Sequence, residues 1–305
     1  MGMTIVRAHA KINLCLALGP AEPPGSERAG WHRIATWMHT VDLADEVGVE
    51  PARGPSTLSV AWAPDAVRPT PIDWTPDKDL GWRALRALER EAGRSLPTRL
   101  VVTKRIPTGA GLGGGSSDAG AVLRAVNGAW ALGLGTERLR AIGATLGSDV
   151  AFFAGASRAA LVRGFGEIVE ERAAVRAGVV LVAPAFSCPT RGVYQAFDAL
   201  GPGVMRGVEV ERAMGRAIAS GRVEGGEGGE LFNDLAPAAE RVRPALAGLR
   251  AGLAAGLGEP VHVTGSGSAL FLLCDEGEAG SLAARAGELA GRLLPGTRVL
   301  ASRLA

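Results

Sequence analysis

The chain has 305 residues, of which 47% are hydrophobic and 21% charged, and its formal net charge at pH 7 is +2. A charge so close to zero gives no extended field of one sign, so the composition indicates no nucleic-acid partner. No apolar run approaches the length of a membrane span and the first ten residues lack a signal-peptide core, so we expect a cytoplasmic protein without a membrane partner. The three cysteines form no CxxC pair, which argues against a zinc knuckle or a disulfide framework.

The first half of the chain predicts strands that lead into helices. From apolar alternation and helical spacing we expect strands over 4–18 (in two pieces), 34–49, 58–62 and 99–104, and helices over 79–92, 117–132 and 137–146. The segment 20–30 is rich in Pro, Gly, Ser and charged residues, which is typical of a loop.

The second half mixes the two kinds of element in the same way. We expect strands over 159–169, 178–183, 261–263, 270–274 and 297–302, and helices over 208–220, 237–257 (one or two) and 277–293. Acidic residues interrupt the glycine-rich segment 225–229, so we expect a surface loop there and no phosphate site. Strands and helices in mixed order predict an α+β protein with two domains, residues 1–170 and 171–305.

The segment 107–117, Pro-Thr-Gly-Ala-Gly-Leu-Gly-Gly-Gly-Ser-Ser, is the most informative part of the sequence. It follows an apolar strand and precedes an Ala-rich helix, so its backbone N–H groups and the positive end of the helix dipole form a seat for phosphate. Residues 109–114 also satisfy GxGxxG, which leaves a dinucleotide-binding oxidoreductase as an alternative. The depth of the loop in the chain and the lack of an acidic residue about 20 positions later argue against that alternative. A glycine-rich hairpin or linker is the structural alternative.

Three polar residues follow these glycines. We expect one of Ser116 and Ser117 to cap the helix and the second hydroxyl to contact a phosphate oxygen or a magnesium ion. Asp118 would then lie in the first turn, where a carboxylate complements the helix dipole.

Lys11 is one of only three lysines in an arginine-rich chain, and it lies between Ala10 and Ile12 in an apolar run. A lysine in such a position requires an anionic partner. Asp149, in Gly-Ser-Asp before another apolar run, is a candidate, although a simple turn or helix-cap role is equally open. A Lys–Asp pair beside a phosphate seat suits phosphoryl transfer to a hydroxyl group.

Other polar and aromatic clusters have a simpler reading. Trp31 and His32 form a pair that suits a nucleobase, but such pairs more often lie on a surface. Asn233-Asp234 and the turn 264–268 are expected to be helix caps or hairpin turns.

Four segments together resemble the GHMP kinase superfamily, and the resemblance covers most of the chain. They are Ala-Lys-Ile-Asn-Leu at 10–14, the glycine loop at 107–117, Gly-Ser-Asp-Val at 147–150, and Thr-Gly-Ser-Gly-Ser at 264–268 with Phe271. The loop is the most specific of the four. The resemblance implies an α+β fold with an S5-like N-terminal domain, a ferredoxin-like C-terminal domain and a site between them.

The resemblance also implies roles for individual residues. Asp149 is the implied catalytic base and Lys11 the cation beside it. The implied ATP-binding residues are Pro107, Thr108, Gly109, Ala110, Gly111, Leu112, Gly113, Gly114, Gly115, Ser116, Ser117 and Lys104, with Ser117 also a candidate ligand of Mg²⁺. The implied substrate-side residues are Asn13, Trp31, His32, Phe165, Thr190 and Tyr194.

Within the superfamily, the best match is to members whose acceptor alcohol carries a cytidine diphosphate. This implies transfer of the γ-phosphoryl group of ATP to the 2-hydroxyl of 4-diphosphocytidyl-2-C-methyl-D-erythritol, a step of non-mevalonate isoprenoid synthesis. The alternatives are another GHMP kinase acting on homoserine, mevalonate or a sugar, the oxidoreductase named above, and a nucleotide-binding protein without catalysis. We expect a monomer or a homodimer. The chain departs from the family pattern at a few positions, namely Trp31 for Tyr, Asp79 for Asn, Asp118 for Asn and Ala151 for Pro.

Overall fold

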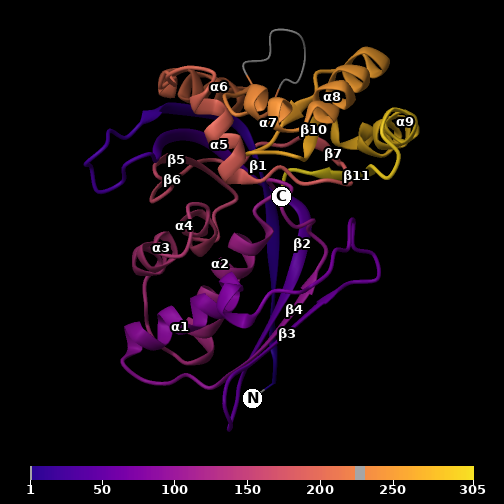
Figure 1. Ribbon diagram of the computed structural model, residues 1–305. Helices are drawn as coiled ribbons and strands as arrows, with labels where there is room; N and C mark the ends of the chain where they lie inside the picture. Colours follow the sequence, from indigo (N-terminus) through magenta and orange to yellow (C-terminus); the bar gives the residue numbers. More distant parts are fainter. Residues whose placement is uncertain (1, 224–230) are drawn as a thin grey trace.

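The computed structural model describes residues 2–223 and 231–305. The glycine-rich segment 225–229, for which we expected a surface loop, lies outside these residues. Two antiparallel-dominated sheets with helices packed on them form the protein, which confirms the α+β prediction (Figure 1). Among the described helices, none has the length and apolar character that crossing a membrane requires.

The first sheet is built on a long hairpin. β1 (Thr4–Ala21) pairs antiparallel with β2 (His32–Pro51), and β4 (Thr98–Lys104) and β3 (Thr57–Trp62) extend the sheet beyond β2. β1 is a single strand, so the prediction of two short pieces over 4–18 was wrong. Residues 10–19 are buried on both faces of the sheet, which removes the alternation that marks a half-buried strand.

Helices cover one face of this sheet. They are α1 (Leu80–Ala92), α2 (Gly114–Ala129), α3 (Thr136–Ala144) and the short α4 (Val150–Ala154), with a 3₁₀ turn at Pro76–Lys78 before α1. Leu85 and Leu88 of α1 and Val122 of α2 are fully buried together with Leu100 of β4. This apolar contact fixes the beginning of α2, and therefore the loop before it, against the sheet.

The predicted strand over 159–169 is in fact a hairpin. β5 (Ala159–Gly164) pairs with β2 and with β6 (Ile168–Glu171). The chain reverses through Gly164 and Gly166, whose φ values are +72° and +108°, a region that favours glycine. A Cβ atom at Gly166 would lie 2.3 Å from the carbonyl oxygen of Ser148, so the turn packs directly against the loop that carries Asp149.

The second sheet has the strand order β11-β7-β10-β9, formed by β7 (Gly178–Ala183), β9 (His262–Val263), β10 (Leu270–Cys274) and β11 (Arg298–Arg303). The helices of this half are α5 (Thr190–Asp198), α6 (Gly207–Ser220), α7 (Ala236–Val242), α8 (Pro244–Leu257) and α9 (Ala279–Leu293), the last preceded by a 3₁₀ turn at Glu276–Glu278. In Figure 1, two of them, α7 and α8, lie above the sheet, α5 and α6 lie to its left, and α9 lies to its right. The segment 237–257 therefore forms two helices, while α4 and α5 were not predicted.

One short strand joins the two halves of the chain. β8 (Phe232–Asn233) comes from the second half and pairs parallel with Cys15 and Leu16 of β1 in the first sheet. The backbone N–H of Asp234 also donates to the carbonyl of Leu16, at 2.9 Å. Residues from the second half of the chain, which come after β7 in the sequence, therefore complete the edge of the first sheet.

Candidate active site

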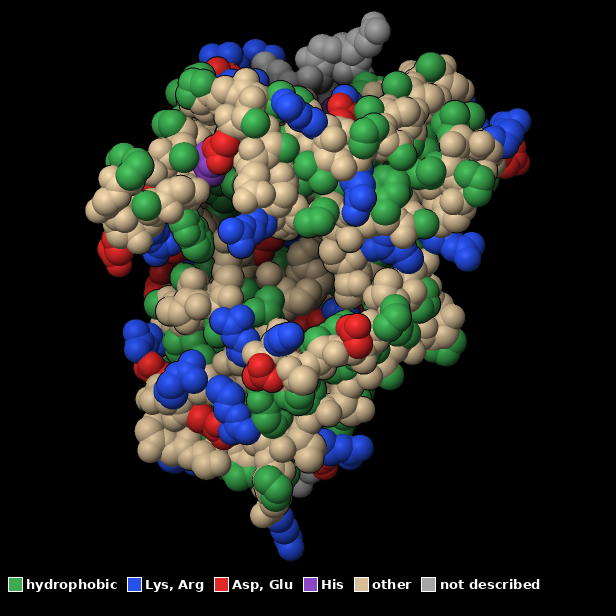
Figure 2. Space-filling view, viewed as in Figure 1, with side chains coloured by type: hydrophobic (Ala, Val, Ile, Leu, Met, Phe, Trp, Pro, Cys, Tyr) green, Lys and Arg blue, Asp and Glu red, His purple; other side chains and the backbone are tan. Residues whose placement is uncertain are grey.

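A cleft of about 1210 Å³ lies between the two halves of the molecule. The hollow is visible across the middle of the face in Figure 2, with Lys, Arg, Asp and Glu side chains on its rim. Its walls include the glycine loop, polar residues of β1, the first turns of α5 and the turn after β9. The four segments that resemble the GHMP kinase motifs therefore meet at one cavity.

The glycine loop presents free backbone donors to this cleft. α2 begins at Gly114, its N-cap residue is Gly113, and no side chain caps it. No partner for the first N–H groups of the helix is found among residues 2–223 and 231–305, so these groups are available to an anion. The expectation that Ser116 or Ser117 caps the helix was wrong, because both lie inside its first turns.

Close contact with the turn 264–268 explains a glycine in this loop. Gly111 has a φ of +81°, and a Cβ atom there would lie 2.4 Å from the carbonyl oxygen of Thr264. The backbone N–H of Ala269 donates to the carbonyl of Ala110 at 2.9 Å, and the N–H of Lys11 donates to the carbonyl of Leu112 at 3.0 Å. The loop is thereby fixed between β1 and the second half of the chain.

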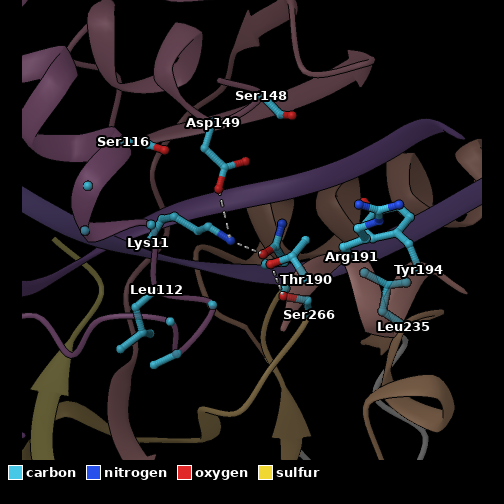
Figure 3. A pocket seen from close by; sticks show the side chains of 18 of the residues that line it. Lys11, Leu112, Ser116, Ser148, Asp149, Thr190, Arg191, Tyr194, Leu235 and Ser266 are labelled. Carbon is cyan, nitrogen blue, oxygen red and sulfur yellow. Dashed lines mark hydrogen bonds and ion pairs between the residues drawn. The ribbon is translucent and has the colours of Figure 1, made fainter. Parts of the chain in front are cut away.

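Lys11 and Asp149 lie next to each other at the centre of the cleft (Figure 3). The Nζ atom of Lys11 is 3.5 Å from Oδ2 of Asp149 and donates a hydrogen bond of 2.5 Å to Oδ1 of Asn13. Lys11 is 3% exposed, whereas the side chain of Asp149 is 26% exposed and open to the cleft. Asp149 occupies the N-cap position of α4, but its carboxylate caps no backbone group and is free for chemistry.

Several hydrogen bonds hold the polar groups beside this pair. The side-chain amide of Asn13 donates to Oγ1 of Thr36 at 2.8 Å, and its backbone N–H donates to Oγ1 of Thr264 at 3.0 Å. Thr190 and Ser266 bring their hydroxyl oxygens to 3.1 Å from each other (Figure 3). α5 and the turn 264–268 are therefore joined at the cleft wall.

Asn233 is a residue whose role the sequence did not reveal. Its side-chain amide donates to the carbonyls of Val263 and Gly265, each at 2.8 Å, and its Oδ1 accepts from the N–H of Leu235. It therefore holds the turn 264–268 in place as well as capping the residues before α7. The chain has only three Asn residues, and this scarcity is the signal that could have pointed to it.

An aromatic group lines the other end of the cleft. Trp31, 53% exposed, has its ring centre 6.2 Å from that of Phe165 in an edge-on arrangement. His32 is buried, and its Nδ1 lies 2.9 Å from the carbonyl oxygen of Gly19. Its Nε2 is 3.0 Å from Oδ1 of Asp198 but is not well directed for a hydrogen bond.

Tyr194 packs at 5.5 Å from the ring of His32. Burial and the charge of Asp149 raise the pKa of Tyr194 to about 12, so its phenol stays protonated at neutral pH.

Lys104 lines the cleft, but its ammonium group is already occupied. It forms ion pairs with Asp45 and with Asp118, the latter at 2.6 Å. Burial alone would lower the pKa of Lys104, but the carboxylates of Asp118 and Asp45 raise it. Burial and the charges of Asp45 and Asp79 raise the pKa of Asp118 to about 7, against the opposing effect of Lys104.

Asp118 lies one turn beyond the start of α2, so the expectation that it complements the helix dipole from the first turn was wrong.

All but one of the expected site residues line the cleft. The exception is Ser117, whose side chain is 2% exposed and faces the interior from α2. Ser116 lines the cleft in its place. In the part of the chain that the structure describes, no group of three His, Cys, Asp or Glu side chains forms a metal site.

Comparison with known proteins agrees with these motifs. The family described as GHMP kinases N terminal domain matches residues 79–156. The 4-diphosphocytidyl-2-C-methyl-D-erythritol kinase of Corynebacterium efficiens is 36% identical over 89% of this chain and 85% of its own length, and that of Nocardia farcinica is 33% identical over 97% and 96%.

Solved structures show the same relationship. A crystal structure of 4-(cytidine 5'-diphospho)-2C-methyl-D-erythritol kinase is 32% identical, covers 99% of both chains and superposes with a TM-score of 0.75. Mevalonate kinase of L. major, at 14% identity and a TM-score of 0.68, shares the fold. The α+β GHMP kinase fold is thereby confirmed, and a dinucleotide-binding oxidoreductase is ruled out. The chain belongs to the 4-diphosphocytidyl-2-C-methyl-D-erythritol kinase family of the GHMP kinases.

Proposed function

We propose that this protein transfers the γ-phosphoryl group of ATP to the 2-hydroxyl of 4-diphosphocytidyl-2-C-methyl-D-erythritol. The observation that carries the proposal is the Lys11–Asp149 pair, set beside the uncapped start of α2 in one cleft. Family membership over nearly the whole chain names the acceptor. An acid–base pair next to a phosphate seat is the arrangement that transfer to an alcohol requires.

Each residue of the pair has a distinct role in the proposal. Asp149, open to the cleft, accepts the proton of the 2-hydroxyl or orients that hydroxyl toward the phosphorus atom. Lys11, buried and held by Asn13, keeps the carboxylate ionised and offsets the negative charge that develops on the transferred group. The N–H groups at the start of α2 and in the glycine loop bind the ATP phosphates.

The residues of the cleft fit a magnesium ion that is held mainly by the nucleotide. Mg²⁺ in such sites takes one or two protein oxygens and completes its shell with phosphates and water. Ser116 presents its hydroxyl oxygen to the cleft beside Asp149 (Figure 3). We propose Ser116 as the protein ligand in preference to Ser117, and the ion would supply charge neutralisation between the phosphates when bound.

The acceptor lies at the aromatic end of the cleft in this proposal. The Trp31–Phe165 pair lies against one side of the cytosine ring, and Tyr194 and the backbone near His32 close the pocket around it. Asn13 and Thr190 contact the erythritol and diphosphate portion.

Three further predictions accompany this proposal. The division of the chain at residue 170 is supported by β6, which ends in the first sheet at Glu171, and by β7, which begins in the second at Gly178. A cytoplasmic location and a monomeric or homodimeric state also stay predictions.

A coupled assay of ADP release tests the proposal. The purified protein is supplied with MgATP and, separately, 4-diphosphocytidyl-2-C-methyl-D-erythritol, homoserine, mevalonate and galactose. We expect turnover with the cytidyl substrate alone and competition by CDP. Turnover with one of the other alcohols, without competition by CDP, would assign the protein to another GHMP kinase activity.

A further inference from the structure

Arg191 is a residue of the cleft whose positive charge has no partner in the described structure. It lies in the first turn of α5, its side chain is exposed, and it lines the cleft between the two halves of the molecule. Within residues 2–223 and 231–305, its guanidinium group makes no hydrogen bond, ion pair or ring contact. A positive charge in the first turn adds to the positive end of the helix dipole, so the stability of α5 does not explain an arginine at this position.

The other cations of the cleft differ from Arg191 in their pairing or in their position. Lys11 and Lys104 both form ion pairs with carboxylates of the protein. Lys78 belongs to the 3₁₀ turn before α1, in the half of the molecule that carries the glycine loop. On the wall that the second half contributes, Arg191 is therefore the cation that remains without a counterion among the described residues.

On one side, Arg191 adjoins the centre of the cleft. The hydroxyl oxygens of its neighbour Thr190 and of Ser266 are 3.1 Å apart, so the start of α5 contacts the turn after β9. In the same turn, a Cβ atom at Gly265 would lie 3.2 Å from Nζ of Lys11. The start of α5 is thus connected to the ammonium group of Lys11 through a single turn of the chain.

On the other side, Arg191 adjoins the aromatic end of the cleft. Residues three positions apart lie on the same face of a helix, so Arg191 and Tyr194 share one face of α5. Figure 3 shows both side chains extending from α5 in the same direction. The ring of Tyr194 lies 5.5 Å from that of His32, in the pocket that we propose for cytosine. Arg191 therefore lies between the end of the cleft proposed for the base and the residues proposed for the reaction.

We propose that Arg191 binds the diphosphate of the acceptor and thereby selects an alcohol that carries a nucleoside diphosphate over an uncharged alcohol. In 4-diphosphocytidyl-2-C-methyl-D-erythritol the diphosphate joins the cytidine to the erythritol. A base beside Tyr194 and a hydroxyl beside Asp149 therefore place the diphosphate along the wall between them, where Arg191 lies. A guanidinium group donates two parallel hydrogen bonds to phosphate oxygens and keeps its charge at neutral pH. The inference rests on the proposed function, because it takes this molecule as the acceptor.

The first experiment measures the contribution of the diphosphate to binding without turnover. Calorimetry compares cytidine with CDP on the unaltered protein. A saturating concentration of a non-hydrolysable ATP analogue is present throughout, so that CDP cannot occupy the ATP site. We expect CDP to bind about ten- to a hundredfold more tightly than cytidine, as for charge-assisted hydrogen bonds. Equal affinities for the two compounds would overturn the proposal.

The second experiment assigns this preference to Arg191. Arg191→Met keeps an apolar stem without the charge, so the preference for CDP over cytidine should fall about tenfold while the affinity for cytidine stays the same. Arg191→Lys, which keeps the charge but not the planar fork, should show an intermediate preference. Arg212→Met removes an exposed arginine of α6 that does not line the cleft, and should leave the preference unchanged.

Two results would contradict the proposal. One is a preference for CDP that persists in an Arg191→Met protein with the melting temperature of the unaltered protein. The other is an equal loss of affinity for cytidine and CDP, since that would mean that Arg191 only shapes the pocket.

These outcomes are separable from the proposed function. A protein that phosphorylates the cytidyl substrate but keeps its preference for CDP in Arg191→Met contradicts only the contact with Arg191. A protein that binds CDP through Arg191 but does not phosphorylate the cytidyl substrate contradicts only the proposed transfer. A protein that binds neither cytidine nor CDP contradicts the proposed acceptor and, with it, this contact.

Discussion

The ammonium nitrogen of Lys11 lies 3.5 Å from Oδ2 of Asp149, although Lys11 belongs to strand β1 and Asp149 lies directly before the short helix α4. Asn13 fixes the lysine from one side, and the turn at Gly166 supports the loop of Asp149 from the other. The pair is therefore preorganised by contacts that do not involve a ligand, which lowers the reorganisation needed at the moment of transfer.

Replacing Asp149 by Asn should lower kcat about a thousandfold and leave ATP affinity nearly unchanged. The amide cannot take up the proton of the acceptor, while the phosphate seat at α2 stays intact. Steady-state kinetics and calorimetry with a non-hydrolysable ATP analogue provide the measurements. Asp73→Asn, an exposed carboxylate outside the cleft, is the matched control. Near-normal turnover of Asp149→Asn would remove this residue from the proton-transfer role.

Replacing Lys11 by Met should also lower kcat by at least a hundredfold, because a neutral side chain cannot offset the charge on the transferred group. Lys11→Arg should restore little activity. A Cβ atom at Gly265 would lie only 3.2 Å from Nζ of Lys11, so a planar guanidinium group has no room there. An arginine variant with wild-type kcat would show that only the positive charge matters.

Gly111→Ala should unfold more easily and bind ATP more weakly. Alanine pays about 1–2 kcal/mol to adopt the left-handed backbone conformation, and here its Cβ would also overlap the carbonyl of Thr264. Gly133→Ala is the matched control, since Gly133 has a similar φ of +69° but open space around it. Urea denaturation should show a larger loss of unfolding free energy for Gly111→Ala than for the control. Equal losses would mean that the contact with Thr264 does not contribute to stability.

Two histidines, the buried His39 and the half-buried His262, should make the fold sensitive to acid. Burial lowers the pKa of His39 to about 4 and that of His262 to about 4, the latter with a contribution from Arg250. His39 donates from Nδ1 to the carbonyl of Thr40 and accepts at Nε2 from the N–H of Val175, so a second proton would break the latter contact.

The sign of the effect follows from proton linkage. Between pH 6.5 and 4 the unfolded chain binds more protons at these two sites than the folded chain, so stability is full above pH 6.5 and is lost as the pH falls. Each site contributes up to about 3 kcal/mol over this interval. Urea midpoints measured from pH 7.5 to 4.5 test this loss of stability. The variant His39→Gln should show a smaller fall of the midpoint with decreasing pH. A urea midpoint that does not fall as the pH is lowered would contradict the neutral state of these two rings in the folded protein.

The motifs of the site were readable from the sequence because each needs particular residue types. The glycine loop needs small residues, and Lys11 in an apolar strand needs an anion. What the sequence did not reveal depends on contacts between distant segments. Asn233 acts only because the turn 264–268 lies beside it, and Ser117 points inward because α2 begins three residues earlier than predicted.

The fold was predictable where periodicity was clear, and less so elsewhere. The helix at 80–92 and the strand at 178–183 follow directly from their apolar spacing. β1 was divided in two because a strand buried on both faces shows no alternation, and the hairpin at 159–171 was read as one strand because Gly164 and Gly166 lie in an otherwise apolar run. The boundary between domains at residue 170 stays a prediction.

The pairing of β8 with β1 has a consequence for the order of folding. Lys11 and Asn13 are synthesised early, but the strand at the edge of β1 and the support of the turn 264–268 arrive only with Phe232 and Asn233. Contacts between segments so far apart in the chain form late and slowly. During synthesis, the edge of β1 at Cys15 and Leu16 therefore stays unpaired until β8 is made, and the nascent protein acquires a finished catalytic cleft only after most of its length has left the ribosome.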